Sequence, residues 1–203
     1  DLLGSLNPEQ KKAVESPAKR IIIQAGPGTG KTLTLTARIA YLISEKGAAP
    51  DSILALTFTN KAARQLETRL EKYVDQKNGR VFAATFHAFC LKILKTYGDF
   101  DSLIIDEKSH RWLLKKEAGN DLSRSEFRKL DQNISLCKQR LLSFEDDLSE
   151  VGAPEDQARL KQVYAAYEKA CDTYHAIDFE SLIFKTVQLL ESNENILSEI
   201  RSQ

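Results

Sequence analysis

The sequence predicts an α/β fold in which a parallel β-sheet with crossover helices precedes an all-helical part. Three short runs rich in apolar residues, at 20–25, 53–58 and 80–84, alternate with helix-like segments in the first half. Such alternation indicates parallel strands, because each crossover helix returns the chain to the same edge of the sheet. Strand signals end near residue 90, and residues 106–203 carry successive amphipathic helical patterns.

Composition narrows the class of protein. A chain of 203 residues can bury a core without disulfides. Lys plus Arg and Asp plus Glu both number 29, so the net charge is zero and any nucleic-acid contact must be local. The three cysteines, Cys90, Cys137 and Cys171, have no C-x-x-C spacing and are expected to be buried thiols. Neither a membrane-length apolar run nor a signal pattern is present, which predicts a soluble cytoplasmic protein without membrane partners.

The elements of the first half follow from their residue patterns. The first expected strand, residues 20–25, is apolar nearly throughout, as in a strand covered on both faces. A helix is expected over residues 31–46, and a second over residues 60–77 with Asn60 as its N-cap. The expected apolar faces of these helices are Leu35, Ile39, Leu42 and Ile43 in the first, and Ala62, Ala63, Leu66 and Leu70 in the second.

The longest helix of the second half is expected over residues 155–174. Its buried stripe is predicted to comprise Leu160, Val163, Tyr164 and Tyr167, which recur at spacings of three and four. This region therefore reads as a helical subdomain.

Residues 25–32, with the sequence AGPGTGKT, lie between the first expected strand and the first long helix. They fit the phosphate-loop pattern G-x-x-x-x-G-K-[ST], with Ala in the first position. Gly28 and Gly30 permit backbone angles that turn successive N–H groups toward an anion at the positive end of the helix. Lys31 is expected to reach the β and γ phosphates, and the Thr32 hydroxyl to ligate Mg²⁺. A plain glycine-rich turn is the alternative, but it needs neither the Lys nor the hydroxyl.

The motif gives a set of expected nucleotide-binding residues. They are Ala25, Gly26, Pro27, Gly28, Thr29, Gly30, Lys31 and Thr32, of which Lys31 and Thr32 are also expected to be catalytic and Thr32 to bind the metal ion.

Three further stretches occur in a fixed order around this loop: LNPEQ at 6–10, LTFTNKAA at 56–63 and ATFHA at 84–88. Together with AGPGTGKT they closely resemble the UvrD/Rep-type superfamily 1 DNA helicases, and AIDFESL at 176–182 extends the resemblance. It implies an ATP-dependent DNA helicase or translocase, with 3′ to 5′ movement and with ATP and Mg²⁺ as cofactors. Its expected partners are single-stranded DNA, duplex junctions and accessory repair or replication proteins.

The resemblance also implies a domain organisation. A RecA-like ATP-binding domain, 1A, is expected over residues 1–90 and again after about residue 180. A helical subdomain, 1B, is expected over residues 91–180. The sequence has no Walker B strand in the family's place and no second motor domain, and it lacks methionine, so the N-terminal part of a longer helicase is expected.

Further residues receive roles from the resemblance. Gln10 matches the Q-motif glutamine, whose amide can pair with the edge of adenine; taken alone, it reads as a solvated residue at a helix start. Phe58 is suited to stack on a base. Phe86 either packs beneath its loop or faces a base. Leu33 departs from the family, in which Arg often follows the Lys-Thr pair. The expected DNA-binding residues are Thr57, Phe58, Thr59, Asn60, Thr85 and His87.

Asp106 and Glu107 offer an alternative. The run before them resembles a Walker B strand, which would place Mg²⁺ and support a stand-alone kinase or nucleotide switch. The apolar run is short, however, and we favour a helix whose N-cap is Asp106 or Ser109. A third possibility is that the helical half binds another protein. His110 and His175 are expected to have no site role.

Overall fold

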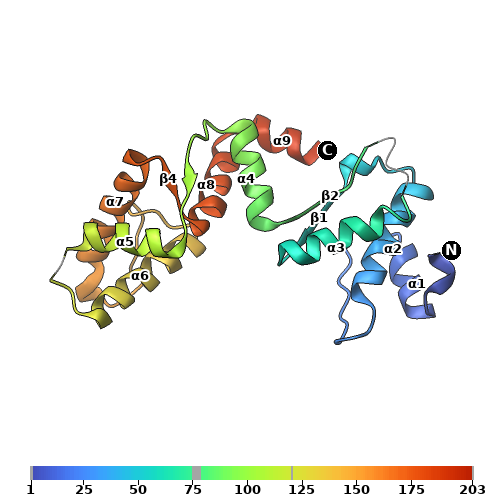
Figure 1. The fold of residues 1–203 in the computed structure, drawn as a ribbon, viewed down its shortest axis with the longest axis horizontal. Helices are drawn as coiled ribbons and strands as arrows, with labels where there is room; N and C mark the ends of the chain where they lie inside the picture. Colours follow the sequence, from blue (N-terminus) through green and yellow to red (C-terminus); the bar gives the residue numbers. More distant parts are fainter. Residues whose placement is uncertain (1, 75–78, 120, 203) are drawn as a thin grey trace. The chain divides into compact units, whose positions relative to one another are not determined.

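The computed structural model describes residues 2–74, 79–119 and 121–202, which form two compact units (Figure 1). Unit 1 comprises the described residues up to Phe86 together with Arg201 and Ser202, and unit 2 comprises His87–Ile200. The elements of unit 1 are η1 (Leu3–Ser5), α1 (Pro8–Glu15), α2 (Lys31–Ser44), η2 (Pro50–Ser52), β1 (Leu54–Thr57), α3 (Asn60–Leu70) and β2 (Phe82–Thr85). Those that follow are α4 (Phe86–Tyr97), β3 (Leu103–Ile104), α5 (Glu107–Ala118), α6 (Arg124–Gln139), η4 (Pro154–Asp156), α7 (Gln157–Thr173), β4 (Ala176–Ile177), α8 (Phe179–Ser192) and α9 (Glu194–Ser202).

Strands β1 and β2 are parallel, with Leu54 opposite Phe82 and Thr57 opposite Thr85. This confirms the strands expected at 53–58 and 80–84 and the parallel pairing between them. Helix α3 connects the two strands and packs on them (Figure 1). The core between these elements comprises Ile39, Ala55, Leu66, Leu70, Val74 and Ala83. The larger RecA-like sheet stays a prediction.

The prediction of a strand at residues 20–25 is wrong, because the structure assigns no strand there. Ile22 is 98% exposed and Ile23 is 49% exposed. A strand forms only with a hydrogen-bonded neighbour, and in the described sheet β1 and β2 pair with each other. The apolar run therefore has high strand propensity without a partner to satisfy it.

The predicted helices of unit 1 are found with small shifts. Helix α2 starts at Lys31 as expected, but its buried residues are Thr34, Thr36, Ala37 and Ile39, and Leu35 is 41% exposed. The N-cap of α3 is Thr59, whose hydroxyl accepts from Ala62 N at 3.1 Å, and not Asn60. This helix ends at Leu70, earlier than expected, and residues 75–77 of the prediction lie outside the described residues.

Unit 2 is mainly helical and has its own core between α5, α6 and α7. The helix expected at 155–174 is confirmed as α7, and Leu160, Val163, Tyr164 and Tyr167 are buried. The expectation that no strand follows residue 90 is wrong, because β3 and β4 pair in parallel, with Leu103 opposite Ala176. Two-residue strands are too short to show a period of two.

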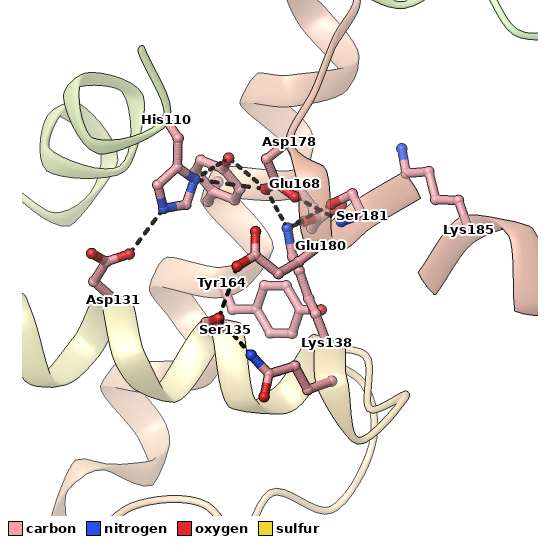
Figure 2. A network of polar contacts seen from close by, with 12 residues as sticks. His110, Asp131, Ser135, Lys138, Tyr164, Glu168, Asp178, Glu180, Ser181 and Lys185 are labelled. Atoms are coloured by element: carbon pink, nitrogen blue, oxygen red, sulfur yellow. Dashed lines mark hydrogen bonds and ion pairs between the residues drawn. The ribbon is translucent and has the colours of Figure 1, made fainter. Parts of the chain in front are cut away.

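A network of buried polar side chains joins α5, α6, α7 and the start of α8 (Figure 2). Lys138 Nζ lies 2.7 Å from Asp178 Oδ2 and from Ser181 Oγ. Its third neighbour is Glu168 Oε1 at 2.8 Å, an ion pair that lacks hydrogen-bond alignment. Burial disfavours the charged lysine, but Asp178 and Glu168 outweigh it and raise the pKa of Lys138. The network thus keeps its charges paired inside the core.

His110 belongs to this network, a set of contacts that was not expected; that it has no site role stays a prediction. Its Nε2 lies 2.9 Å from Asp131 Oδ1, and its Nδ1 lies 2.6 Å from the Tyr167 hydroxyl. The Tyr167 hydroxyl donates to Asp178 Oδ2 at 2.7 Å, so the network links α5 to α6, α7 and α8. Among the described helices, none has the length and apolarity required to cross a membrane.

Candidate nucleotide and nucleic-acid site

The loop before α2 has the backbone that its glycines were expected to allow. Gly28 has φ +76° and Gly30 has φ +86°, both in the left-handed region that favours glycine. The Thr29 hydroxyl donates to Gly26 O at 2.8 Å and closes the turn. Gly30 directly precedes α2, so the loop ends where the first free N–H groups of the helix point outward.

Lys31 is folded back over this loop. Its ammonium group donates to Ala25 O at 3.1 Å and to Gly26 O at 2.7 Å. Lys31 and Thr32 are both exposed to solvent. The ammonium group therefore lies over the loop backbone and is accessible to an anion.

Gln10 contacts the loop through both ends of its amide. Its Oε1 accepts from Asn7 N at 3.0 Å in a capping box at the start of α1, and its Nε2 donates to Thr29 O at 3.0 Å. Gln10 therefore positions the loop relative to α1. Adenine recognition by Gln10 requires at least one of these hydrogen bonds to be exchanged for a base contact.

A cavity of about 620 Å³ lies against the loop. Its lining residues are Gly28, Gly30, Lys31, Thr32, Leu33, Thr36, Arg69, Lys72 and Tyr73. Arg69, in the last turn of α3, and Lys72 and Tyr73, which follow the helix, were not among the residues expected from the sequence. Three cationic side chains thus face one cavity beside a helix N-terminus.

The expected DNA-binding residues of unit 1 lie at the carboxyl ends of the two strands. Thr57 and Thr85 are register partners, so both motifs reach the same edge of the sheet. Phe58, directly after β1, is 96% exposed, which leaves its ring free to stack. The Thr57 hydroxyl donates to Thr59 O at 3.0 Å and shapes the turn into α3. Asn60 opens that helix, and Phe86, after β2, is half exposed.

His87 lies in the first turn of α4 and belongs to unit 2. Its ring is edge-on to Phe179, with the ring centroids 5.6 Å apart. Phe179 opens α8 and is 51% exposed. The sequence stretch at 176–182 was recognised as a family element, but no role was expected for this ring. A pocket lined in part by both rings and by Leu141 lies beside them.

Asp106 serves as a helix cap. Its carboxylate accepts from Ser109 N at 2.8 Å, as expected of the N-cap of α5. These hydrogen bonds lower the pKa of Asp106. The preceding strand, β3, has two residues and pairs with β4, whereas β1 pairs with β2. The Walker B interpretation of Asp106 and Glu107 therefore loses its structural basis.

Comparison with known proteins decides the family. Residues 6–203 match the UvrD/REP helicase N-terminal domain. The chain belongs to the UvrD/REP helicase N-terminal domain family. This confirms the resemblance drawn from the four motifs.

The UvrD/REP relatives include proteins named ATP-dependent DNA helicase PcrA. The chain is 35% identical over 206 residues to that of Bacillus subtilis, covering 97% of this chain and 28% of the relative. It is 36% identical over 198 residues to that of Staphylococcus epidermidis, covering 94% and 27%. It is 35% identical over 204 residues to that of Staphylococcus aureus, covering 97% and 28%. The chain thus spans less than a third of the length of these relatives.

Proposed function

We propose that this chain is the N-terminal ATP- and single-stranded-DNA-binding part of an ATP-dependent DNA helicase or translocase. The observation that carries the proposal is the cavity in which Lys31, Arg69 and Lys72 face the N-terminus of α2. A triphosphate needs several cations and free backbone N–H groups, and this cavity offers both. The relatives named as ATP-dependent DNA helicases favour ATP and DNA as the ligands.

In this proposal the residues of the loop at 25–30 other than Pro27, which has no backbone N–H, surround the phosphates through their N–H groups. Lys31 exchanges its loop carbonyls for the β and γ phosphates, and the Thr32 hydroxyl would hold Mg²⁺. When bound, Mg²⁺ would supply positive charge that offsets the negative charge of the phosphates. Gln10 couples α1 to the loop and contributes to adenine recognition after exchanging one hydrogen bond.

DNA binding is assigned to the carboxyl ends of β1 and β2 and to the start of α4. Phe58 stacks on a base, while Thr57, Thr59, Asn60 and Thr85 bind the strand's phosphates. His87 contacts the backbone, and its neighbour Phe179 adds a second exposed ring. Stacking tolerates any base, so DNA binding of this kind does not depend on sequence and suits movement along one strand. A 3′ to 5′ direction, action at duplex junctions and domains 1A and 1B belong to the same proposal.

The nucleotide part is tested by titrating the full chain with a fluorescent ATP analogue, with and without Mg²⁺. Lys31→Ala is expected to weaken binding by about tenfold or more, since it removes charged hydrogen bonds to phosphate. Thr32→Ala is expected to reduce the increase in affinity for the analogue that Mg²⁺ brings. Lys12→Ala removes an exposed lysine from α1 and serves as control. Equal binding by Lys31→Ala and the parent chain would overturn the proposal.

The DNA part is tested on the same proteins with a labelled single-stranded oligonucleotide. Phe58→Ala is expected to weaken binding by about fivefold or more, from the loss of one stacked base. Lys31→Ala is expected to retain oligonucleotide binding. An oligonucleotide affinity that is unchanged in Phe58→Ala would contradict the assignment of this strand end to DNA.

A further inference from the structure

An exposed aromatic and cationic cluster lies on unit 2, outside the sites described above. Trp112 on α5 is the chain's single tryptophan and is 64% exposed. Tyr174, which follows α7, is 53% exposed. Lys116 Nζ lies 5.7 Å from the centroid of the Trp112 ring and 5.0 Å from that of Tyr174, and it donates to the Tyr174 hydroxyl at 2.7 Å. The ammonium group thus fixes two rings side by side while most of the indole stays in solvent.

The same face of α5 is strongly basic. Lys108, Lys115 and Lys116 stand four residues before and three and four residues after Trp112, so all three surround it on the helix surface. Arg111 is engaged by Glu107 at 2.6 Å. Within the described part of the chain, neither Lys108 nor Lys115 forms an ion pair, although the charge of Lys108 helps to lower the pKa of the Asp106 carboxyl. This local concentration of positive charge stands out in a chain of zero net charge.

Helix stability explains only part of this cluster. Helix α5 packs into the core of unit 2 through Leu113, Leu114 and Ala118, which lie on the side of the helix away from Trp112. Basic residues in the last turn favour the helix dipole, and this explains Lys115 and Lys116. Neither effect accounts for a large apolar ring held in solvent among three lysines.

We propose that the face of α5 formed by Lys108, Trp112, Lys115 and Lys116, together with Tyr174, is a second contact for single-stranded nucleic acid. A base stacks on the exposed indole, and the lysines bind the flanking phosphates. An acidic polypeptide would satisfy the lysines but offers no flat ring at each charged unit, whereas every nucleotide supplies both. The inference rests on the proposed function in taking DNA as the ligand.

The single tryptophan makes the test specific to this face. The full chain is titrated with an oligo(dT) strand while the fluorescence of Trp112 is recorded, and stacking is expected to quench it. Lys108→Gln and Lys115→Gln are each expected to reduce the slope of log affinity against log salt by about 0.7. Lys46→Gln is the matched control, because Lys46 is also exposed and lies 5.5 Å from the ring centroid of Tyr41, at the far end of α2.

Two further variants separate this contact from the DNA-binding residues proposed above. Phe58→Ala is expected to keep the quenching of Trp112, although its overall affinity falls. Trp112→Ala, followed with a labelled strand, is expected to bind about fivefold or more weakly, with partial rescue in Trp112→Phe. Binding of the labelled strand without any change in Trp112 fluorescence would overturn the inference and leave the proposed function intact. Equal quenching by polyglutamate would overturn it in favour of an acidic protein partner.

Discussion

Gly30 has no side chain, and the Gln10 amide of α1 occupies the space beside it. A Cβ at this position would lie 2.7 Å from Gln10 Nε2, and the backbone has φ +86°. Gly28 has a similar φ of +76°, but a Cβ there would meet no atom within 4 Å. Substitution of either glycine would therefore strain the backbone, and substitution of Gly30 would also bring the new Cβ against the Gln10 amide.

This difference predicts the outcome of a mutant cycle. Gly28→Ala is expected to lower the free energy of unfolding of unit 1 by about 1 kcal/mol, from left-handed backbone strain alone. Gly30→Ala is expected to cost more, and Gln10→Ala is expected to recover the excess when combined with it. Urea unfolding measures each term. Additive effects of Gly30→Ala and Gln10→Ala would show that the amide moves away without cost.

His110 is predicted to make the stability of unit 2 depend on pH. Burial lowers the pKa of His110, but hydrogen bonds and charge from Asp131 and Asp178 outweigh it and raise the pKa from 6.5 to about 9. The other groups that face it are the Tyr167 hydroxyl and, beyond Asp178, Lys138, whose pKa values are both raised. Neither is expected to lose its proton below pH 9.

The raised pKa of His110 sets the direction in which the stability of unit 2 changes with pH. A histidine with a higher pKa in the folded state contributes its full stabilisation below pH 6.5 and loses it as pH rises through about 9. The free energy of unfolding of unit 2 is therefore expected to fall between these values by at most about 3 kcal/mol. Urea unfolding at pH 6, 7.5 and 9 measures this change with Trp112 as the probe. His110→Gln should flatten the profile, and a slope that persists in this variant would assign it to another group.

At the scale of elements, Lys138 and Lys129 offer a comparison within one helix. Both lie on α6 and both have an acidic partner, but the side chain of Lys138 is 1% exposed and that of Lys129 is 55% exposed. Lys138→Met removes the cation between the carboxylates of Asp178 and Glu168 and leaves Asp178 with His110 as its remaining charged partner, which is expected to cost about 3–5 kcal/mol. Lys129→Met breaks the surface pair with Asp156 and is expected to cost less than about 1 kcal/mol.

Unfolding of unit 2, followed by the fluorescence of Trp112, measures both variants. Asp178 also accepts from Ser181 N at 2.7 Å as the N-cap of α8, so its displacement should fray the start of that helix, where Phe179 lies. Equal costs for the two substitutions would show that the buried network contributes no more than a surface ion pair.

The elements that the sequence predicted well are those with a strong local signal. Helix α7 has an apolar stripe over several turns, and the AGPGTGKT loop has a fixed pattern of glycines before a helix. The misses depend on contacts distant in sequence. The strand expected at 20–25 needs a neighbour, β3 and β4 each need the other, and His110 acquires its partners from α6 and α7. The choice of Thr59 over Asn60 as N-cap is a shift of one residue that residue preferences do not resolve.

For the whole molecule, the segment at 20–25 has a consequence for association. Ile21, Ile22 and Ile23 are 38%, 98% and 49% exposed and form a contiguous run of β-branched residues. Such a run beside unpaired backbone groups is a template for pairing with another strand. A second copy of this chain offers the same segment, so we expect the 203-residue chain to self-associate as its concentration rises.

Ile22→Lys is expected to suppress this association, because a charge on the exposed face opposes strand pairing between copies. Leu103→Lys is the matched control, since Leu103 is 72% exposed but lies in β3 of unit 2, where its N–H already donates to His175 O. Sedimentation velocity over a range of protein concentrations measures the outcome. Association that persists in Ile22→Lys and disappears in Leu103→Lys would show that the copies associate through unit 2 instead. Suppression by Ile22→Lys alone would place the contact between copies at the isoleucine run, as expected if its exposed β-branched side chains drive the association.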